Sequence, residues 1–259
     1  MKIIPIGKLH DIDADGYIQN PCIVPLKQEK YHHVVNEILA ELSYKFKEHI
    51  HSLYIRGSVA KGIAIEFVSD IDLVFLCNQS IGDEIKKDIR ILLNTINKKF
   101  NFINGIEVLF ITKINIDNIK TQFLLKTQCA CIYGVDIIPT LKSFKINQYA
   151  FSHSNGFYQS MIDIKAELMN ETNLDEIKEI CTWTMKRIIR TGFETVMIKD
   201  QSYTRDLYPN YLIFSNYYPE KEADMKLALT FAINPTSDKI EILKVMDSLV
   251  DFIKAQIVQ

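Results

Sequence analysis

Two aspartates two positions apart, at the start of an apolar run, are the residues of this chain that most clearly could do chemistry. Asp70 and Asp72 enter the run 71–76, which is typical of a buried strand. Side chains at i and i+2 of a strand point to the same side, so the two carboxylates should project together. Two like charges at the edge of a buried strand repel and lose hydration unless a cation lies between them. The pattern therefore indicates a divalent metal site.

A glycine-serine turn and a third acid accompany this pair. Gly57 and Ser58 follow a predicted strand, 51–56, and form a turn in which the backbone can approach a phosphate group. Glu107 is the only charged residue of the apolar run 106–111, where packing would favour an apolar side chain. Each feature alone is a weak signal, because Gly-Ser and Asp are common in ordinary turns. In combination they indicate metal-dependent nucleotidyl transfer.

The elements that must position these residues follow from the spacing of the apolar side chains. Strands are expected over 51–56, 72–77 and 105–112, with a helix over 83–100 between the last two. An amphipathic helix over 31–49 precedes the first strand, and a hairpin with its turn near 13–16 is expected within residues 1–28.

Beyond about residue 146 the pattern changes to long amphipathic helices. They are expected over 158–169, 174–197, 222–231 and 238–258, with Ser237 as the cap of the last helix. The sequence therefore predicts an α+β protein. A mixed β-sheet domain with flanking helices is expected over 1–146, hairpin included, and an all-helical domain over 147–259, with substrate bound in the cleft between them.

The Gly-Ser turn, the Asp-x-Asp pair and the later acid on a neighbouring strand together resemble the signature of the DNA polymerase β nucleotidyltransferase superfamily. The resemblance covers residues 34–139, including the Tyr133-Gly134 segment with Asp136 nearby, which is similar to the segment that closes this domain in small bacterial members. It implies a nucleotidyltransferase-type fold and transfer of AMP from ATP. It also implies two Mg²⁺ ions held by Asp70 and Asp72.

The same resemblance implies roles for the remaining residues of the motif. Glu107 would be the general base and would also touch one metal ion. The residues that would contact the nucleotide in this part of the chain are Gly57, Ser58 and Lys61.

A second resemblance lies in the helical half of the chain. Residues 184–188, the Thr-Gly pair after them and Arg205-Asp206 are similar to the helical lobe of streptomycin/spectinomycin adenylyltransferases. In those enzymes an arginine and a later lysine contact ATP, which implies Arg187 and Arg205 as nucleotide-binding residues here. Considered as residues alone, these cations also suit a solvated helix face and a surface loop. The implied acceptor is a small-molecule hydroxyl, with an aminoglycoside-like antibiotic as one candidate.

Net charge and the lengths of the apolar runs indicate which kinds of partner this chain has. A net charge of −2 over 259 residues gives no overall attraction to nucleic acid, which favours a small-molecule acceptor over RNA. No apolar run approaches the ~20 residues of a membrane span. The amino terminus lacks the charged-then-apolar pattern of a signal peptide, so we expect a cytoplasmic protein without a membrane partner. Five cysteines, mostly within apolar runs, are typical of reduced core thiols.

Three other classes of function stay open at this point. They are an enzyme that adenylylates a protein, an RNA-directed nucleotidyltransferase and a non-catalytic nucleotide sensor. The intact set of three acids argues against the sensor, because degenerate members of the superfamily lose one of them.

Overall fold

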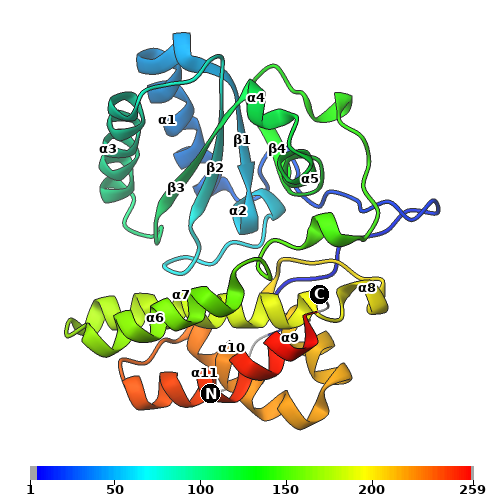
Figure 1. The fold of residues 1–259 in the computed structure, drawn as a ribbon. Coiled ribbons are helices and arrows are strands. Elements are labelled where there is room, and N and C mark those ends of the chain that lie inside the picture. The colour runs from blue at the N-terminus through cyan, green and yellow to red at the C-terminus, as the bar shows by residue number, and fades with distance from the viewer. Residues whose placement is uncertain (1–4, 258–259) are drawn as a thin grey trace. The chain divides into compact units, whose positions relative to one another are not determined.

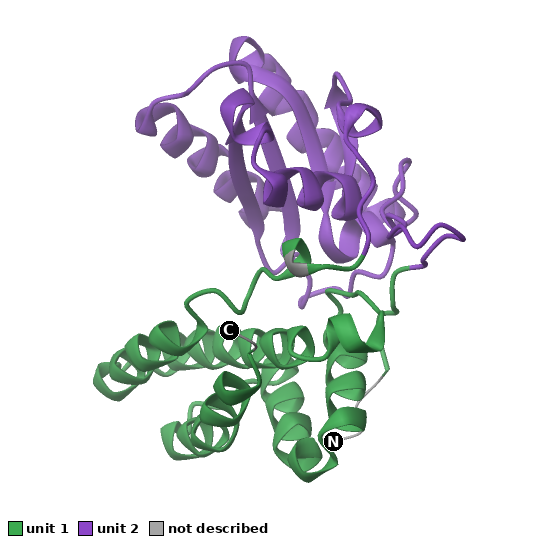
Figure 2. Ribbon diagram, turned by 45° about the vertical axis from the view of Figure 1, so that its right-hand side comes forward, with its two compact units in different colours: residues 1–10, 146–259 green, residues 11–145 purple. Residues whose placement is uncertain are grey.

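The computed structural model describes residues 5–257, which divide into two compact units. Figure 2 colours them separately. The sheet unit comprises residues 11–145, and the helical unit comprises the residues up to 10 together with those from 146 onward.

A mixed four-stranded sheet with the order β3-β2-β1-β4 is the centre of the sheet unit (Figure 1). Strand β1 is antiparallel to β2 and to β4, whereas β2 and β3 are parallel and are connected through helix α3. The elements of this unit are α1 (Glu29–Phe46), η1 (Lys47–His49), β1 (Ile50–Arg56), α2 (Gly57–Lys61), β2 (Ile71–Cys77), α3 (Asp83–Lys99), β3 (Ile106–Thr112), α4 (Lys113–Ile116), α5 (Ile119–Gln128), β4 (Cys129–Gly134) and η2 (Ile138–Thr140).

Helices cover both faces of this sheet, as the period of two along each strand requires. Leu53 and Phe75 belong to the face that packs against the apolar residues of α1 and α3. Tyr54 and Val74, one position away, belong to the opposite face and pack with Leu125 of α5. The second face, here called the α5 face, is also the one to which Arg56, Asp72 and Glu107 belong, by the same alternation of side chains.

The amino-terminal part of the sheet unit forms a turn with one antiparallel bridge, Ile12–Ile18, where a hairpin was expected within residues 1–28. The Asp13 carboxylate accepts hydrogen bonds from the N–H groups of Asp15 at 3.1 Å and Tyr17 at 2.8 Å, which closes the turn. An isolated two-stranded ribbon is only marginally stable in water, so alternation of apolar residues alone did not extend this pairing. Residues 1–4 of the expected hairpin lie outside the described residues.

Helix α7 is the centre of the helical unit and packs against α6, α9, α10 and α11. At Gly192 of α7, a Cβ atom would lie 2.8 Å from Met225 Cε and 3.0 Å from Phe214 Cδ2, so α7 approaches α9 and α10 closely. The elements of this unit are η3 (Gln148–Ala150), α6 (Phe157–Asn170), α7 (Leu174–Glu194), α8 (Met197–Asp200), α9 (Leu207–Tyr217), η4 (Pro219–Lys221), α10 (Glu222–Ile233) and α11 (Lys239–Gln256).

The predicted α+β organisation, a mixed sheet with flanking helices followed by a helical region, is confirmed. The predicted cap of the last helix is wrong by one residue: the Asp238 carboxylate accepts from the N–H groups of Ile240 and Glu241, and Ser237 does not cap α11. Aspartate also carries a charge that favours a helix N-terminus. Within residues 5–257, no helix combines the length and the apolar character that crossing a bilayer requires.

Candidate active site

Asp72, near the start of β2, has a charged residue beside it in each neighbouring strand. Arg56 is its register partner in β1, and Arg56 Nη2 donates a hydrogen bond to Asp72 Oδ1 at 2.8 Å. Glu107 is its register partner in the parallel strand β3. Register partners on neighbouring strands point to the same face of the sheet and lie side by side. One positive and two negative side chains therefore form a row across β1, β2 and β3.

Gly57 begins α2 directly after β1 and lies against the Asp72 carboxylate. Its φ of +76° is in the left-handed region, and a Cβ at this position would overlap Asp72 Oδ2. Only glycine satisfies both conditions. Ser58 follows on α2, and Lys61 is the last residue of that helix. The Gly-Ser turn and the Asp-x-Asp motif, separate in sequence, are thus in contact in the fold.

Gly57→Ala should destabilise the protein by about 1–3 kcal/mol, because a side chain at this φ is strained and displaces Asp72. Urea denaturation followed by circular dichroism would measure the free energy of unfolding. The matched control is Gly82→Ala, since Gly82 has φ −67° and its Cβ would meet nothing within 4 Å. Equal, small effects of both substitutions would contradict the described geometry.

Asp70 precedes β2 and is held by the segment before β3. Its Oδ1 accepts a hydrogen bond from Asn104 Nδ2 at 2.8 Å, and a Cβ at Gly105 would lie 3.2 Å from the same oxygen. No three His, Cys, Asp or Glu side chains lie close enough together to hold a metal ion in the part of the chain that the structure describes. The Asp70 and Asp72 carboxylates are instead engaged with Asn104 and Arg56.

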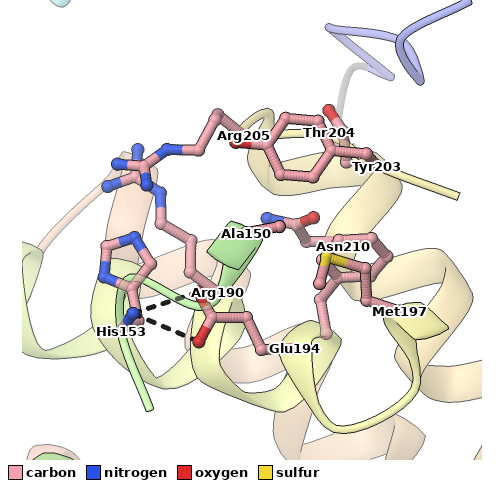
Figure 3. A pocket seen from close by; sticks show the side chains of 10 residues that line it. Ala150, His153, Arg190, Glu194, Met197, Tyr203, Thr204, Arg205 and Asn210 are labelled. Atoms are coloured by element: carbon pink, nitrogen blue, oxygen red, sulfur yellow. Dashed lines mark hydrogen bonds between the residues drawn. The ribbon is translucent and has the colours of Figure 1, made fainter. Parts of the chain in front are cut away.

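The two arginines predicted from the second resemblance are brought together in the helical unit. Arg187 is on α7 and Arg205 precedes α9, and with Arg190 they form what we call the arginine cluster. All three act on one histidine: burial, then the charges of Arg205, Arg190 and Arg187, lower the pKa of His153 to about 2. Figure 3 shows the guanidinium groups of Arg190 and Arg205 beside the His153 ring.

The arginine cluster borders a cavity too small for a substrate. Lined by Arg190, Arg205, His153 and Asn210 among others, the cavity has a volume of about 10 Å³, room for about one water molecule. Neighbouring guanidinium groups repel each other, so their grouping is favourable when an anion lies among them. Guanidinium groups match phosphate oxygens in charge and geometry. The cluster itself, rather than the cavity, is therefore suited to bind phosphate groups.

Acidification should destabilise the helical unit through His153. The pKa of His153 is about 2 in the fold, against the ordinary 6.5, so its ring is neutral in the folded protein. Its contribution to the free energy of unfolding is therefore fully present above pH 6.5. That contribution falls at lower pH, because the unfolded chain takes up a proton there. Between pH 7 and about pH 5 the loss is about 2 kcal/mol. Urea unfolding at both pH values should show this loss for the wild type but not for His153→Gln. An equal loss in both proteins would contradict the buried neutral ring.

Arg56, Asn104 and His153 are site residues that the sequence reasoning did not single out. Arg56 had a usable signal, because it is a charge at the end of a buried strand, directly before the glycine turn. Asn104 and His153 lie in irregular segments, where no periodicity predicts the direction of a side chain.

Comparison with known proteins agrees with this geometry. Residues 35–128, from α1 to the end of α5, match the family model described as a nucleotidyltransferase domain. The match includes all six residues to which the first resemblance gives a role, from Gly57 to Glu107. No curated protein matches the chain in sequence.

Among solved structures, spectinomycin adenyltransferase AAD(9) from Enterococcus faecialis, crystallised with ATP and spectinomycin, is similar over 88% of this chain and 98% of its own, with 14% sequence identity and a TM-score of 0.49. The assignment of a nucleotidyltransferase domain rests on the family model, whose match includes the glycine turn and the acids that the sheet brings together. The chain thus contains a nucleotidyltransferase domain at residues 35–128 and is a transferase enzyme.

Proposed function

We propose that this enzyme transfers AMP from ATP to a hydroxyl group of a small-molecule acceptor and releases pyrophosphate. The observation that carries the proposal is the row of charges on the α5 face. Asp72 lies against Gly57, where a phosphate can approach the backbone. Glu107 is the register partner of Asp72 in the neighbouring strand β3. A phosphate-binding turn, a charged centre and a neighbouring base are the parts that nucleotidyl transfer needs.

Magnesium suits the donor set of this site. Asp70 and Asp72 supply carboxylate oxygens, which Mg²⁺ prefers as ligands, from one end of one strand, and Glu107 would be a further ligand. Both aspartates are engaged by donors, Arg56 and Asn104, whose place a cation could take. Two Mg²⁺ ions held there would neutralise phosphate charge and stabilise the attacking and leaving oxygens.

The residues of the chain supply the remaining steps. Gly57 lets the β- and γ-phosphates approach the backbone, while the Ser58 hydroxyl and the Lys61 ammonium donate hydrogen bonds to them. Glu107 accepts the proton of the acceptor hydroxyl as general base. The acceptor oxygen then forms a bond to the α-phosphorus. The bond from that phosphorus to the bridging oxygen breaks, and pyrophosphate leaves.

Arg187 and Arg205 are proposed to bind phosphate groups of the nucleotide. The grouping of both with Arg190 around a neutral histidine supports this, because the three positive charges favour an anion of high charge. Metal ions do not neutralise the whole charge of a triphosphate, so fixed cations are needed as well.

The experiment is to measure pyrophosphate release from each nucleoside triphosphate with Mg²⁺, with and without a panel of aminoglycosides. Release with ATP that depends on an acceptor, and that Asp72→Asn abolishes, supports the proposal. If pyrophosphate release requires lysate proteins or RNA in place of an aminoglycoside, the acceptor is a protein or an RNA and not a small molecule. A protein that binds no nucleotide in the presence of Mg²⁺ would contradict the proposed reaction.

A further inference from the structure

One buried carboxylate of the helical unit accepts hydrogen bonds from three consecutive residues of a single segment. Glu194, the last residue of α7, is 6% exposed. Its Oε1 accepts from the N–H groups of Ser152 at 2.8 Å and His153 at 3.0 Å, and its Oε2 accepts from the N–H groups of His153 at 3.1 Å and Ser154 at 2.8 Å. Both serine hydroxyls also donate to it. The dashed lines in Figure 3 mark its bonds with His153.

The segment that Glu194 holds also accepts hydrogen bonds from two members of the arginine cluster. We call residues 152–155 the serine turn. Arg205 Nη1 donates to Ser152 Oγ at 2.6 Å. Arg187 Nη2 donates to the carbonyl of Asn155 at 3.3 Å. The turn thus connects one carboxylate to two guanidinium groups that come from α7 and from the segment before α9.

Charge explains why the connection is indirect. A carboxylate paired directly with the arginines would occupy the donors that an anion needs. The carboxylate oxygens of Glu194 instead accept hydrogen bonds from the N–H and hydroxyl groups of the serine turn. Its charge still compensates part of the cluster, and it opposes the lowering of the Arg187 pKa that burial causes. The arrangement orients the guanidinium groups of Arg187 and Arg205, each through one N–H donor, and leaves their carboxylate-binding donors to a ligand.

We propose that Glu194 is a positioning residue for polyphosphate binding: through the serine turn it fixes Arg187 and Arg205 in the orientation that receives the phosphate groups of the nucleotide. This inference rests on the proposed function and deepens it. Glu194 does not touch the nucleotide. Arginine side chains have many rotamers, so holding two of them in place before binding removes an entropic cost from the binding step.

The test compares ATP affinity of the full chain, measured by isothermal titration calorimetry with Mg²⁺, in Glu194→Gln, in the double arginine variant Arg187→Ala/Arg205→Ala, and in the triple variant that combines them. An amide in place of the carboxylate turns an N–H₂ group toward N–H donors and releases the turn. Glu194→Gln should bind ATP roughly 10- to 100-fold more weakly than the wild type, the range found when groups that orient metal ligands are removed, and the double arginine variant should bind it at least as weakly as Glu194→Gln. The triple variant should bind no more weakly than the double arginine variant, because Glu194 acts only through these two arginines.

A merely structural role of Glu194 predicts a different result. Amide hydrogen exchange at residues 152–154 should become faster in Glu194→Gln, which confirms release of the turn. Faster exchange with unchanged ATP affinity, or a triple variant that binds ATP more weakly than the double arginine variant, would overturn the proposal. The control for general destabilisation is Ser248→Ala, which removes hydrogen bonds with Lys221 and Asp224 in the same unit and should keep ATP affinity.

The outcomes separate this inference from the function on which it rests. If the wild type binds ATP and the double arginine variant binds it equally well, the positioning role is wrong while the transferase reaction stands. If the wild type binds no ATP, both the proposed reaction and the positioning role fail.

Discussion

Replacing Asp72 by asparagine should lower the rate of nucleotidyl transfer by at least about 10²–10³-fold, the loss that follows removal of one preorganised electrostatic group. Asp72 is the central member of the row of charges, with Arg56 on one side and Glu107 on the other. The asparagine keeps the shape of the side chain but loses the charge that would hold a metal ion. Pyrophosphate release at saturating ATP and Mg²⁺ measures the effect.

The fold should survive this substitution. The Arg56–Asp72 ion pair keeps about a quarter of each side chain exposed, 25% and 23%, so Arg56 can be solvated when its partner is lost. Asp83→Asn is the matched control. It also removes a carboxylate that pairs with a cation, Lys86 Nζ at 3.0 Å, in the same unit, and it should leave the rate unchanged. Normal turnover of Asp72→Asn would show that the site lies elsewhere.

Much of the sheet unit was predictable because its strands and helices have clear periods. The expected strands and the helix between β2 and β3 occur within a few residues of their predicted ends. The common side of Asp70 and Asp72 follows from the period of two. What the sequence did not contain is the pairing of strands. Glu107 and Arg56 became neighbours of Asp72 only through the register of β1, β2 and β3.

Two helices without a usable period were not predicted. In α5 the apolar residues are Ile119 and the consecutive 123–125, too few to form a stripe that repeats over several turns. Helix α9 is apolar on almost all sides and has Pro209 and Asn210 in its first turn, a composition that also suits an irregular buried segment. Tertiary packing, rather than local pattern, determines both helices.

The arginine cluster shows a further limit of sequence reasoning. Arg187 and Arg205 are 18 positions apart, and nothing in their spacing indicates that both bind the serine turn. Glu194 is equally inconspicuous as an acid at the end of a long helix. Its role depends on burial and on six hydrogen bonds from a segment about 40 residues earlier in the chain.

Glu107→Gln should lower the rate of the chemical step by about 10²–10⁴-fold, the contribution of a positioned general base, with little change in ATP affinity. Glu107 is exposed on the edge strand β3, so the substitution leaves no buried cavity and no unpaired core group. Glutamine has nearly the same size but cannot take the proton of the acceptor hydroxyl. Single-turnover kinetics would measure the chemical step, and equilibrium dialysis would measure ATP binding.

The division of the effect between rate and affinity decides the role of Glu107. A slow chemical step with normal ATP binding assigns it to proton transfer, whereas an equal loss of metal-dependent ATP affinity makes it mainly a metal ligand. Glu37→Gln is the matched control, because Glu37 is an acid of α1, on the other face of the sheet, where it pairs with Lys99 Nζ at 2.7 Å. It should change neither quantity. A normal rate in Glu107→Gln would remove the base from the proposed mechanism, and the proton would then have to leave the acceptor by another route.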